Sequence, residues 1–334
     1  MRSISFAAGR IKSSRAGTTR RTTLRRVLLG VLALLLALGV TTYTVYRRDL
    51  IAARTAASSG SSMLTTACGD VELATRGAGS PVLSVHGTGG GWDQGLFLAR
   101  GLVERGYRVV APSRYGYLRT PMPDDPSPRA EADMFVCVLE ALRIERAAVI
   151  AASAGATPAL QFVLRHPDRV SALVLLVPAI GGISVPDTIG LVSPFIMNVV
   201  LGSDFPYWAA MKAWPKATLT VVAVPQSLVP SLTPQGRRTL EEAARSIMPV
   251  TWRREGILYD AHNQNHERPY PLERIDVPTL LVSAEDDLYK TMANARAAAA
   301  KIPNARLMAF TSGGHLLLDR DAELWPVVAE FIRR

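Results

Sequence analysis

Ser153 has the sequence context of a nucleophile that performs acyl transfer. It lies in Ala151-Ala152-Ser153-Ala154-Gly155, which directly follows an apolar run and opens a helical pattern. A sharp turn from strand to helix brings the flanking backbone segments close together, so small residues are expected around a serine held exposed for attack. Ala151 stands where the motif G-x-S-x-G has its first glycine. The segment therefore predicts a nucleophilic serine at the end of a strand.

A base and an acid for this serine occur later in the chain. A serine hydroxyl is a weak nucleophile at neutral pH, so it needs an imidazole base that a carboxylate holds in the correct tautomer. His315 follows two glycines on a loop after the last predicted strand. Asp287 lies just after the strand predicted near Thr279–Ser283 and is the preferred acid. Asp286 and Glu285 are the alternatives. The other histidines outside the glycine-rich stretch follow a helix or belong to a long insertion: His166, His262 and His266.

A glycine-rich stretch after an earlier strand could stabilise the negative charge that develops on a substrate oxygen. His86, Gly87 and Gly89 belong to this oxyanion loop, and its glycines allow backbone N–H groups to face a substrate. We expect the two donors of the oxyanion hole to be the amides of Thr88 and Ala154. The spacing fits neither glycine-rich motif that binds phosphates, so a dinucleotide site is not expected.

The first 46 residues have the pattern of a membrane anchor. Residues 27–46 carry no charge, and a helix of about 20 residues spans a bilayer core of roughly 30 Å. Arginines flank this run on both sides, and residues 1–26 form a basic tail. The excess of positive charge before the span predicts a cytoplasmic N-terminus and a catalytic domain on the other side. We therefore expect a single-pass protein that contacts the membrane through residues 27–46.

Two alternatives to the anchor remain open, and both concern targeting. A cleaved signal peptide would release a secreted protein, since small residues at 52–53 and 56–57 offer cleavage sites, although signal peptides usually have a shorter apolar core. The acid-free start, rich in arginine and serine, also resembles a mitochondrial transit peptide. Residues 47–64 are small and polar and predict a flexible linker, so the folded domain is expected at 65–334.

Composition excludes several classes of protein. The formal net charge is +10, but eight basic residues and no acid fall within residues 1–26, so the rest of the chain carries only +2. The part of the chain after residue 26 therefore lacks the broad basic face that nucleic-acid binding requires. Cys68 and Cys137 are too few for a zinc cluster or a disulfide-built scaffold, and we expect two unpaired thiols, with lipidation of Cys68 as a minor alternative.

Strands and helices alternate after residue 65, as in a parallel sheet covered on both faces. Strands are predicted near Val71–Thr75, Val82–Val85, Arg108–Ala111, Ala147–Ala151, Ala172–Val177, Thr279–Ser283 and Arg306–Phe310. Helices are predicted near Asp93–Arg105, Arg129–Leu142, Ala154–Arg165, Met292–Ala300 and Asp321–Arg333. Residues from about 183 to 274 leave this alternation and predict a helical cap over the carboxyl edge of the sheet, where ligands bind in open α/β folds.

The motifs HGTGGGWDQG, ASAGATPAL, SAEDDLY and SGGHLLL resemble those of capped, esterase- and lipase-like members of the α/β-hydrolase superfamily. The resemblance extends from about residue 65 to residue 334. It implies a mostly parallel eight-stranded sheet with helices on both faces and a triad of Ser153, Asp287 and His315. It also implies that no cofactor takes part, and the sequence gives no reason to expect a metal site. A serine at the elbow argues against dehalogenases and epoxide hydrolases, which place an aspartate there.

The reaction expected from these residues is hydrolysis of an ester, or of an amide or thioester, through an acyl-enzyme on Ser153. Large apolar side chains concentrated at 189–208 favour a small apolar substrate. The alternatives are a cofactor-free haloperoxidase or perhydrolase, in which peroxide replaces water, and a catalytically silent protein of the same fold that binds a ligand.

Overall fold

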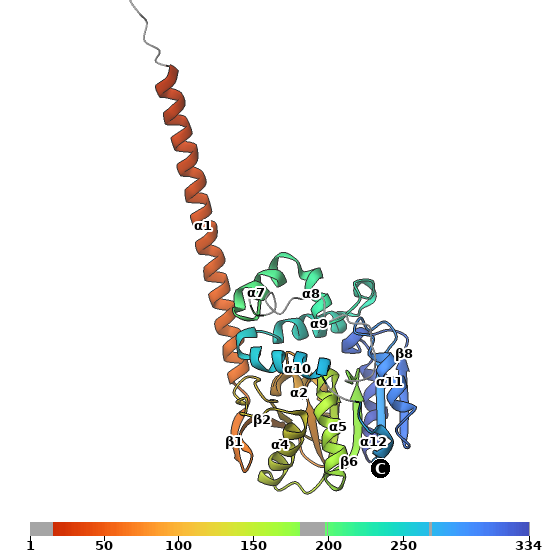
Figure 1. The fold of residues 1–334 in the computed structure, drawn as a ribbon. Coiled ribbons are helices and arrows are strands. Elements are labelled where there is room, and N and C mark those ends of the chain that lie inside the picture. Colours follow the sequence, from red (N-terminus) through yellow and green to blue (C-terminus); the bar gives the residue numbers. More distant parts are fainter. Residues whose placement is uncertain (1–15, 181–197, 199, 267–268, 334) are drawn as a thin grey trace, which may run out of the picture. The chain divides into compact units, whose positions relative to one another are not determined.

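The computed structural model describes residues 16–180, 198, 200–266 and 269–333. The chain forms two compact units, one that ends at Asp49 and one that begins at Leu50. Helix α1 (Ala16–Ser58) contributes residues to both units (Figure 1). From Thr23 onward it is the one helix in the described ranges that is long and apolar enough to cross a membrane.

The unit from Leu50 onward is built on an eight-stranded sheet with the strand order β1-β2-β4-β3-β5-β6-β7-β8. The strands are β1 (Ser62–Thr66), β2 (Gly69–Arg76), β3 (Pro81–Val85), β4 (Arg108–Pro112), β5 (Ala147–Ala152), β6 (Val170–Leu176), β7 (Thr279–Ala284) and β8 (Ala305–Phe310). β2 pairs with β1 and β4 in antiparallel fashion, and all other pairs are parallel. This confirms the expected sheet. β1 was not predicted, because its residues are mostly exposed and lack an apolar pattern.

Helices cover both faces of the sheet and bury an apolar layer on each. One face carries α2 (Trp92–Leu98), α3 (Arg100–Val103) and α12 (Asp321–Arg333), and the other carries α4 (Pro128–Ala141), α5 (Ala156–Arg165) and α11 (Thr291–Ala299). The helix predicted at 93–105 is divided in two at Ala99. β5 lies at the centre of the sheet, and all its residues are buried, as its uninterrupted apolar run requires.

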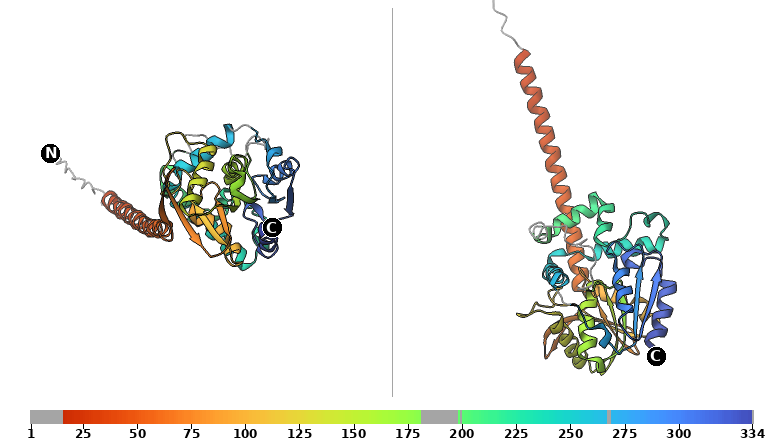
Figure 2. Two further views of the ribbon diagram at one scale, coloured as in Figure 1. Left: turned by 90° about the horizontal axis from the view of Figure 1, so that it is seen from below. Right: turned by 45° about the vertical axis from the view of Figure 1, so that its right-hand side comes forward.

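The described part of the insertion between β6 and β7 forms a helical cap at one end of the sheet (Figures 1 and 2). It contains α7 (Asp204–Ala213), α8 (Pro215–Val221), α9 (Pro234–Ser246) and α10 (Arg254–His266). Single 3-10 turns occur in the cap and elsewhere: η1 (Ser153–Gly155), η2 (Pro167–Arg169), η3 (Val229–Ser231), η4 (Val250–Trp252), η5 (Leu272–Arg274) and η6 (Gly314–Leu316). Residues 183–197 of the expected cap, with most of the apolar cluster at 189–208, lie outside the described residues.

The expected flexible linker at 47–64 is wrong for most of its length. Residues up to 58 are helical, and β1 begins at Ser62. Leu50 and Ala57 are buried, the carbonyl of Ala57 accepts a hydrogen bond from Trp92 Nε1 at 3.2 Å, and Arg54 pairs with the buried Asp204 at 3.3 Å. Small residues are common in flexible linkers, but alanines are also strong helix formers that pack closely. The alanines between residues 52 and 57 extend α1 instead of forming a linker.

The expectation of two unpaired thiols is also wrong, because Cys68 and Cys137 form a disulfide with a Cα–Cα distance of 5.9 Å. Cys68 lies in the turn between β1 and β2, and Cys137 lies on α4, which packs beside β1. The two residues are 69 positions apart, so only the tertiary arrangement brings them together.

Reduction of this disulfide should lower the free energy of unfolding by about 2–4 kcal/mol, since the crosslink restricts the unfolded chain. Urea unfolding of the unit from Leu50 onward, with and without dithiothreitol, measures the effect. The double variant Cys68→Ser/Cys137→Ser should unfold at the lower midpoint in both conditions. An unchanged midpoint of the wild-type protein in reductant would contradict the pairing.

Candidate active site

The backbone holds Ser153 in a left-handed conformation between a strand and a helix. β5 ends at Ala152, Ser153 has a φ of 52°, and the chain continues through η1 into α5. This conformation is unfavourable for a residue with a Cβ, and it is the strained turn expected of a nucleophile elbow. Ser153 is partly exposed, so a substrate can reach its hydroxyl.

Two glycines allow the elbow and the oxyanion loop to approach each other closely. A Cβ at Gly155 would lie 2.5 Å from the carbonyl oxygen of His86, and a Cβ at Gly87 would lie 2.9 Å from the Cβ of Ser153. Any side chain at either position would therefore push the two segments apart. A small residue is required at 155 because the oxyanion loop packs against it, which is the steric reason that we expected. A glycine is required at 87 because the elbow packs against it from the other side.

His315 and Asp287 are brought together at the carboxyl ends of β8 and β7. The fully buried Asp287 lies 2.8 Å from His315 Nδ1, and it also accepts hydrogen bonds from the amide of Tyr289 at 2.8 Å and from the hydroxyl of Thr291. Burial acts to raise the pKa of Asp287, but the His315 charge and these hydrogen bonds outweigh it and hold the pKa below its usual value. An ionised Asp287 keeps the proton of His315 on Nδ1 and leaves Nε2 to act as a base.

The two alternative acids have other partners. Asp286 accepts hydrogen bonds from the two glycine amides that precede His315, at 2.8 and 3.3 Å, and so holds the loop rather than the imidazole. Glu285 is half-exposed and pairs with Arg296 on α11. The geometry therefore favours Asp287 as the residue that orients His315.

Ser153 and His315 share the same edge of the sheet, since β5 and β8 are parallel members of one sheet. The Ser153 hydroxyl makes no hydrogen bond to any residue in the described ranges, so the structure does not link it to His315 Nε2. Catalytic hydrogen bonds are often long in free enzymes and tighten when substrate binds.

His86 supports the oxyanion loop as a neutral, buried imidazole. Its Nε2 accepts a hydrogen bond from the amide of Arg114 at 2.9 Å, so Nδ1 carries the proton and donates to the carbonyl of Gly87 at 2.8 Å. Burial and the charge of Arg114 lower the pKa of His86 well below its usual value. This agrees with the expected place of His86 in the loop, and it excludes His86 as a base because both ring nitrogens are occupied.

The amides of the oxyanion loop differ in whether they have partners. Gly87 donates to Gln94 Oε1 at 2.8 Å, Gly89 donates to Tyr117 Oη at 3.4 Å, and Gly90 donates to the carbonyl of Gly87 at 3.2 Å. The amide of Thr88 has no hydrogen-bond partner within the described part of the chain. It is therefore available to a substrate oxygen. Ala154, the other expected donor, follows Ser153 in η1.

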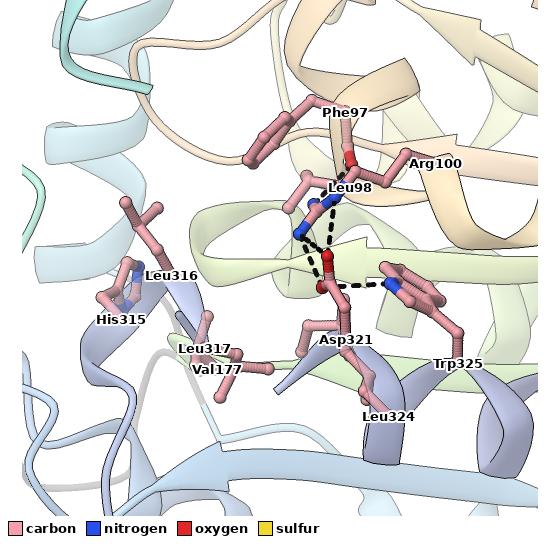
Figure 3. Close-up of a pocket in the computed structure, with 11 residues that line it drawn as sticks. Phe97, Leu98, Arg100, Val177, His315, Leu316, Leu317, Asp321, Leu324 and Trp325 are labelled. Carbon is pink, nitrogen blue, oxygen red and sulfur yellow. Dashed lines mark hydrogen bonds and ion pairs between the residues drawn. The ribbon is translucent and has the colours of Figure 1, made fainter. Parts of the chain in front are cut away.

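A cavity of about 30 Å³ lies beside His315 (Figure 3). Apolar side chains, among them Val177, Leu316 and Leu317, line the part near the imidazole, and the ion pair of Arg100 with Asp321 forms the opposite side. A volume of this size accommodates a water molecule, which is the second reactant in hydrolysis.

A group of buried charges surrounds the oxyanion loop and was not predicted from the sequence. Arg114 is 1% exposed and pairs with Glu131 on α4 and with Asp260 on α10. Arg253 is fully buried, pairs with Asp93 and donates to the carbonyl of Gly90. Arg114 lies two residues after the end of β4, at the same sheet edge as the oxyanion loop. This position is the feature of the sequence that could have indicated its role.

Comparison with known families agrees with the sheet order and the site geometry. A family model described as the alpha/beta hydrolase fold matches residues 80–322, which is most of the chain. The chain belongs to the α/β-hydrolase family. The expected family and fold are confirmed.

Individual α/β hydrolases resemble the chain over most of its length. A 2-hydroxymuconate semialdehyde hydrolase from Pseudomonas putida is 27% identical over 77% of this chain and 88% of its own. A solved alpha/beta hydrolase fold protein from Nakamurella multipartita is 27% identical with a TM-score of 0.65, covering 82% of this chain and 99% of its own. An esterase from Exiguobacterium antarcticum has a TM-score of 0.61 at 19% identity, and the match covers 82% of this chain and 99% of the esterase. At this identity the likeness shows the fold alone. Two relatives above 35% identity match this chain over only about two fifths of their own length.

Proposed function

We propose that the protein hydrolyses a carboxylic ester of a small apolar substrate through an acyl-enzyme on Ser153, with His315 as base and Asp287 as orienting acid. The observation that carries the proposal is the hydrogen bond between the buried Asp287 and Nδ1 of His315, at the sheet edge where Ser153 is held in a strained turn. No metal or cofactor is part of the proposed reaction.

Each group at the site has a defined role in the proposed reaction. His315 Nε2 takes the proton of the Ser153 hydroxyl as the oxygen attacks the substrate carbonyl, and it then returns the proton to the leaving alcohol. The amides of Thr88 and Ala154 stabilise the oxyanion of the tetrahedral intermediate. Water then attacks the acyl-enzyme carbonyl while His315 Nε2 takes a proton from it. His315 returns this proton to Ser153 Oγ as the bond between Oγ and the acyl carbon breaks and the acid product leaves.

A substrate series tests the apolar preference. Large apolar side chains are concentrated at 189–208 of the sequence, and each methylene buried against such a surface contributes about 0.8 kcal/mol until the acyl site is full. We expect kcat/KM for p-nitrophenyl esters to rise from acetate through medium chain lengths and then to fall by decanoate. Equal values across the series, or a preference for charged acyl groups, would contradict an apolar acyl site.

A second candidate reaction follows from the relatives. A relative that aligns over most of its length is named as a 2-hydroxymuconate semialdehyde hydrolase. The same proposed residues could hydrolyse a related unsaturated keto acid. Assay of 2-hydroxymuconate semialdehyde beside the p-nitrophenyl esters distinguishes the two, since kcat/KM should be higher for the substrate class to which the site is adapted.

We further propose that α1 anchors the protein in a membrane as a single pass, with a cytoplasmic N-terminus and the hydrolase unit outside. The charge-free run at 27–46 and the basic residues before it support this topology. The disulfide supports it independently, because such bonds persist in compartments outside the cytosol. A secreted protein released by signal cleavage would be consistent with the disulfide but not with membrane retention.

Truncation separates the anchor from the folded unit. A chain that begins at Asp49 should remain in the supernatant after ultracentrifugation and keep full esterase activity, because it loses the apolar run and retains residues 50–58. A chain that begins at Ser61 should unfold at lower temperature, since it loses the buried Leu50 and Ala57 and the pair of Arg54 with Asp204. Equal melting temperatures of the two chains would contradict a structural role for residues 50–58.

A further inference from the structure

The cap contacts the oxyanion loop (residues 86–90) through the buried carboxylate of Asp260, in addition to the hydrogen bond from Arg253 to the carbonyl of Gly90. Asp260 lies on α10 and is 3% exposed, and its Oδ2 accepts a hydrogen bond from the hydroxyl of Thr88 at 2.9 Å. The amide of Thr88, unlike those of Gly87, Gly89 and Gly90, has no hydrogen-bond partner among the described residues. The side chain of Thr88 is therefore fixed by the cap, while its backbone N–H remains available to a substrate.

Asp260 is itself held rigidly by a buried cation. Arg114 donates to Oδ1 of Asp260 at 2.6 Å and to Oδ2 at 3.1 Å, and its guanidinium also contacts both carboxylate oxygens of Glu131. Burial acts to lower the pKa of Arg114, but the charges of Asp260 and Glu131 outweigh it and raise the pKa well above its usual value. Asp260 cannot turn away without leaving part of a buried cation unpaired, which is strongly unfavourable.

A second connection joins the same carboxylate to the loop. Tyr117 donates its hydroxyl proton to Asp260 Oδ2 at 2.6 Å, and its oxygen accepts from the amide of Gly89 at 3.4 Å. Burial and the charge of Asp260 raise the pKa of Tyr117 well above its usual value, so the hydroxyl keeps its proton and remains a donor. Asp260 thus holds Thr88 directly and Gly89 through Tyr117.

We propose that Asp260 is a positioning residue that acts from the cap to orient the Thr88 amide toward the developing oxyanion. The inference rests on the proposed hydrolysis at Ser153. An oxyanion donor works only when it lies about 2.7–3.1 Å from the oxygen in the transition state. A small rotation of the peptide between Gly87 and Thr88 therefore lowers kcat, while the binding of the ground-state substrate changes little.

Two substitutions at Thr88 isolate the hydroxyl. Thr88→Val keeps the amide and the side-chain shape but removes the hydrogen bond to Asp260, and kcat for a p-nitrophenyl ester should fall by about 10- to 100-fold with KM within about two-fold. Thr88→Ser keeps the hydroxyl and should restore kcat to within about three-fold of wild type. The affinity for a trifluoromethyl ketone, which forms a tetrahedral adduct with the serine, should fall in Thr88→Val by the same factor as kcat.

Thr251→Val is the matched control, because Thr251 makes an equivalent bond elsewhere in the cap. Its hydroxyl donates to Oδ2 of Asp204 at 3.0 Å, and Asp204 is also 3% exposed. This variant should lose stability comparable to Thr88→Val, measured by thermal unfolding, with kcat unchanged. Asp260→Asn should lower kcat at least as much as Thr88→Val, since it also weakens the contacts with Arg114.

Each result supports or overturns the inference. It is overturned if Thr88→Val has wild-type kcat, if Thr88→Ser is equally impaired, if the loss appears in KM alone, or if Thr251→Val lowers kcat equally. A full-length wild-type protein that hydrolyses no ester and is not labelled by a fluorophosphonate would instead overturn the proposed function, and with it the inference. An active wild type with an equally active Thr88→Val overturns the inference alone.

Discussion

Replacement of Ser153 by alanine should reduce kcat for any ester substrate by about a million-fold and abolish labelling by a fluorophosphonate probe. The substitution removes the attacking oxygen and nothing else, because alanine fits a turn whose neighbours are all small. The φ of 52° is equally unfavourable for serine and for alanine, so the melting temperature should change little. Stopped assays of ester hydrolysis with purified protein, together with gel-based probe labelling, measure both effects.

Ser231→Ala is a suitable control for this experiment. Ser231 is an exposed cap residue whose hydroxyl donates to a backbone carbonyl, so its loss should affect neither labelling nor turnover. Wild-type turnover by Ser153→Ala would show that another group carries out the reaction.

Replacement of Asp287 by asparagine should lower kcat by about 10⁴-fold, because the asparagine amide no longer holds the proton of His315 on Nδ1. The wrong tautomer then presents a protonated Nε2 to Ser153. Asp286→Asn should cost far less, since Asp286 contacts loop amides rather than the imidazole. The kcat of Glu285→Gln should be close to that of wild type, because Glu285 makes only a half-exposed ion pair. A larger loss at Asp286 than at Asp287 would reverse the assignment of the acid.

The pH dependence of the stability that Asp287 contributes follows from its lowered pKa. A depressed folded-state pKa contributes stability that is fully present above the unfolded value of about 3.9 and is lost as the pH falls through the folded-state pKa. Asp287 is therefore ionised throughout the neutral range. The difference in stability between wild type and Asp287→Asn should therefore shrink only in strong acid, which urea unfolding at neutral and strongly acidic pH measures.

Local signals in the sequence were sufficient for most of the sheet and for the residues at its carboxyl edge. Buried parallel strands such as β5 require uninterrupted apolar runs, so their positions follow from composition along the chain. Ser153 is marked by the small residues that its turn requires, and His315 is marked by the glycines before it. β1 has no comparable signal, because an exposed edge strand needs no apolar pattern.

Features that depend on contacts between distant segments could not be predicted in this way. Arg114 and Asp260 are 146 positions apart, and the cysteines of the disulfide are 69 apart. Nothing in the local sequence distinguishes a charged residue that pairs in the interior from one that is solvated at the surface. Among the three acids at 285–287, the sequence favoured Asp287 but left Asp286 and Glu285 open, and the contacts of each carboxylate are visible only in the tertiary structure.

The attachment of the cap to the oxyanion loop also limits how this scaffold can be re-engineered. Arg253 and Asp260 belong to the insertion, yet they bind the loop that precedes α2. A graft that replaces the whole insertion with that of another hydrolase would therefore remove supports for the reaction centre together with the substrate-selecting surface. An exchange confined to α7, α8 and α9 keeps those supports. The cap thus contains a segment open to diversification and a segment, from Val250 to His266, that a chimera has to retain.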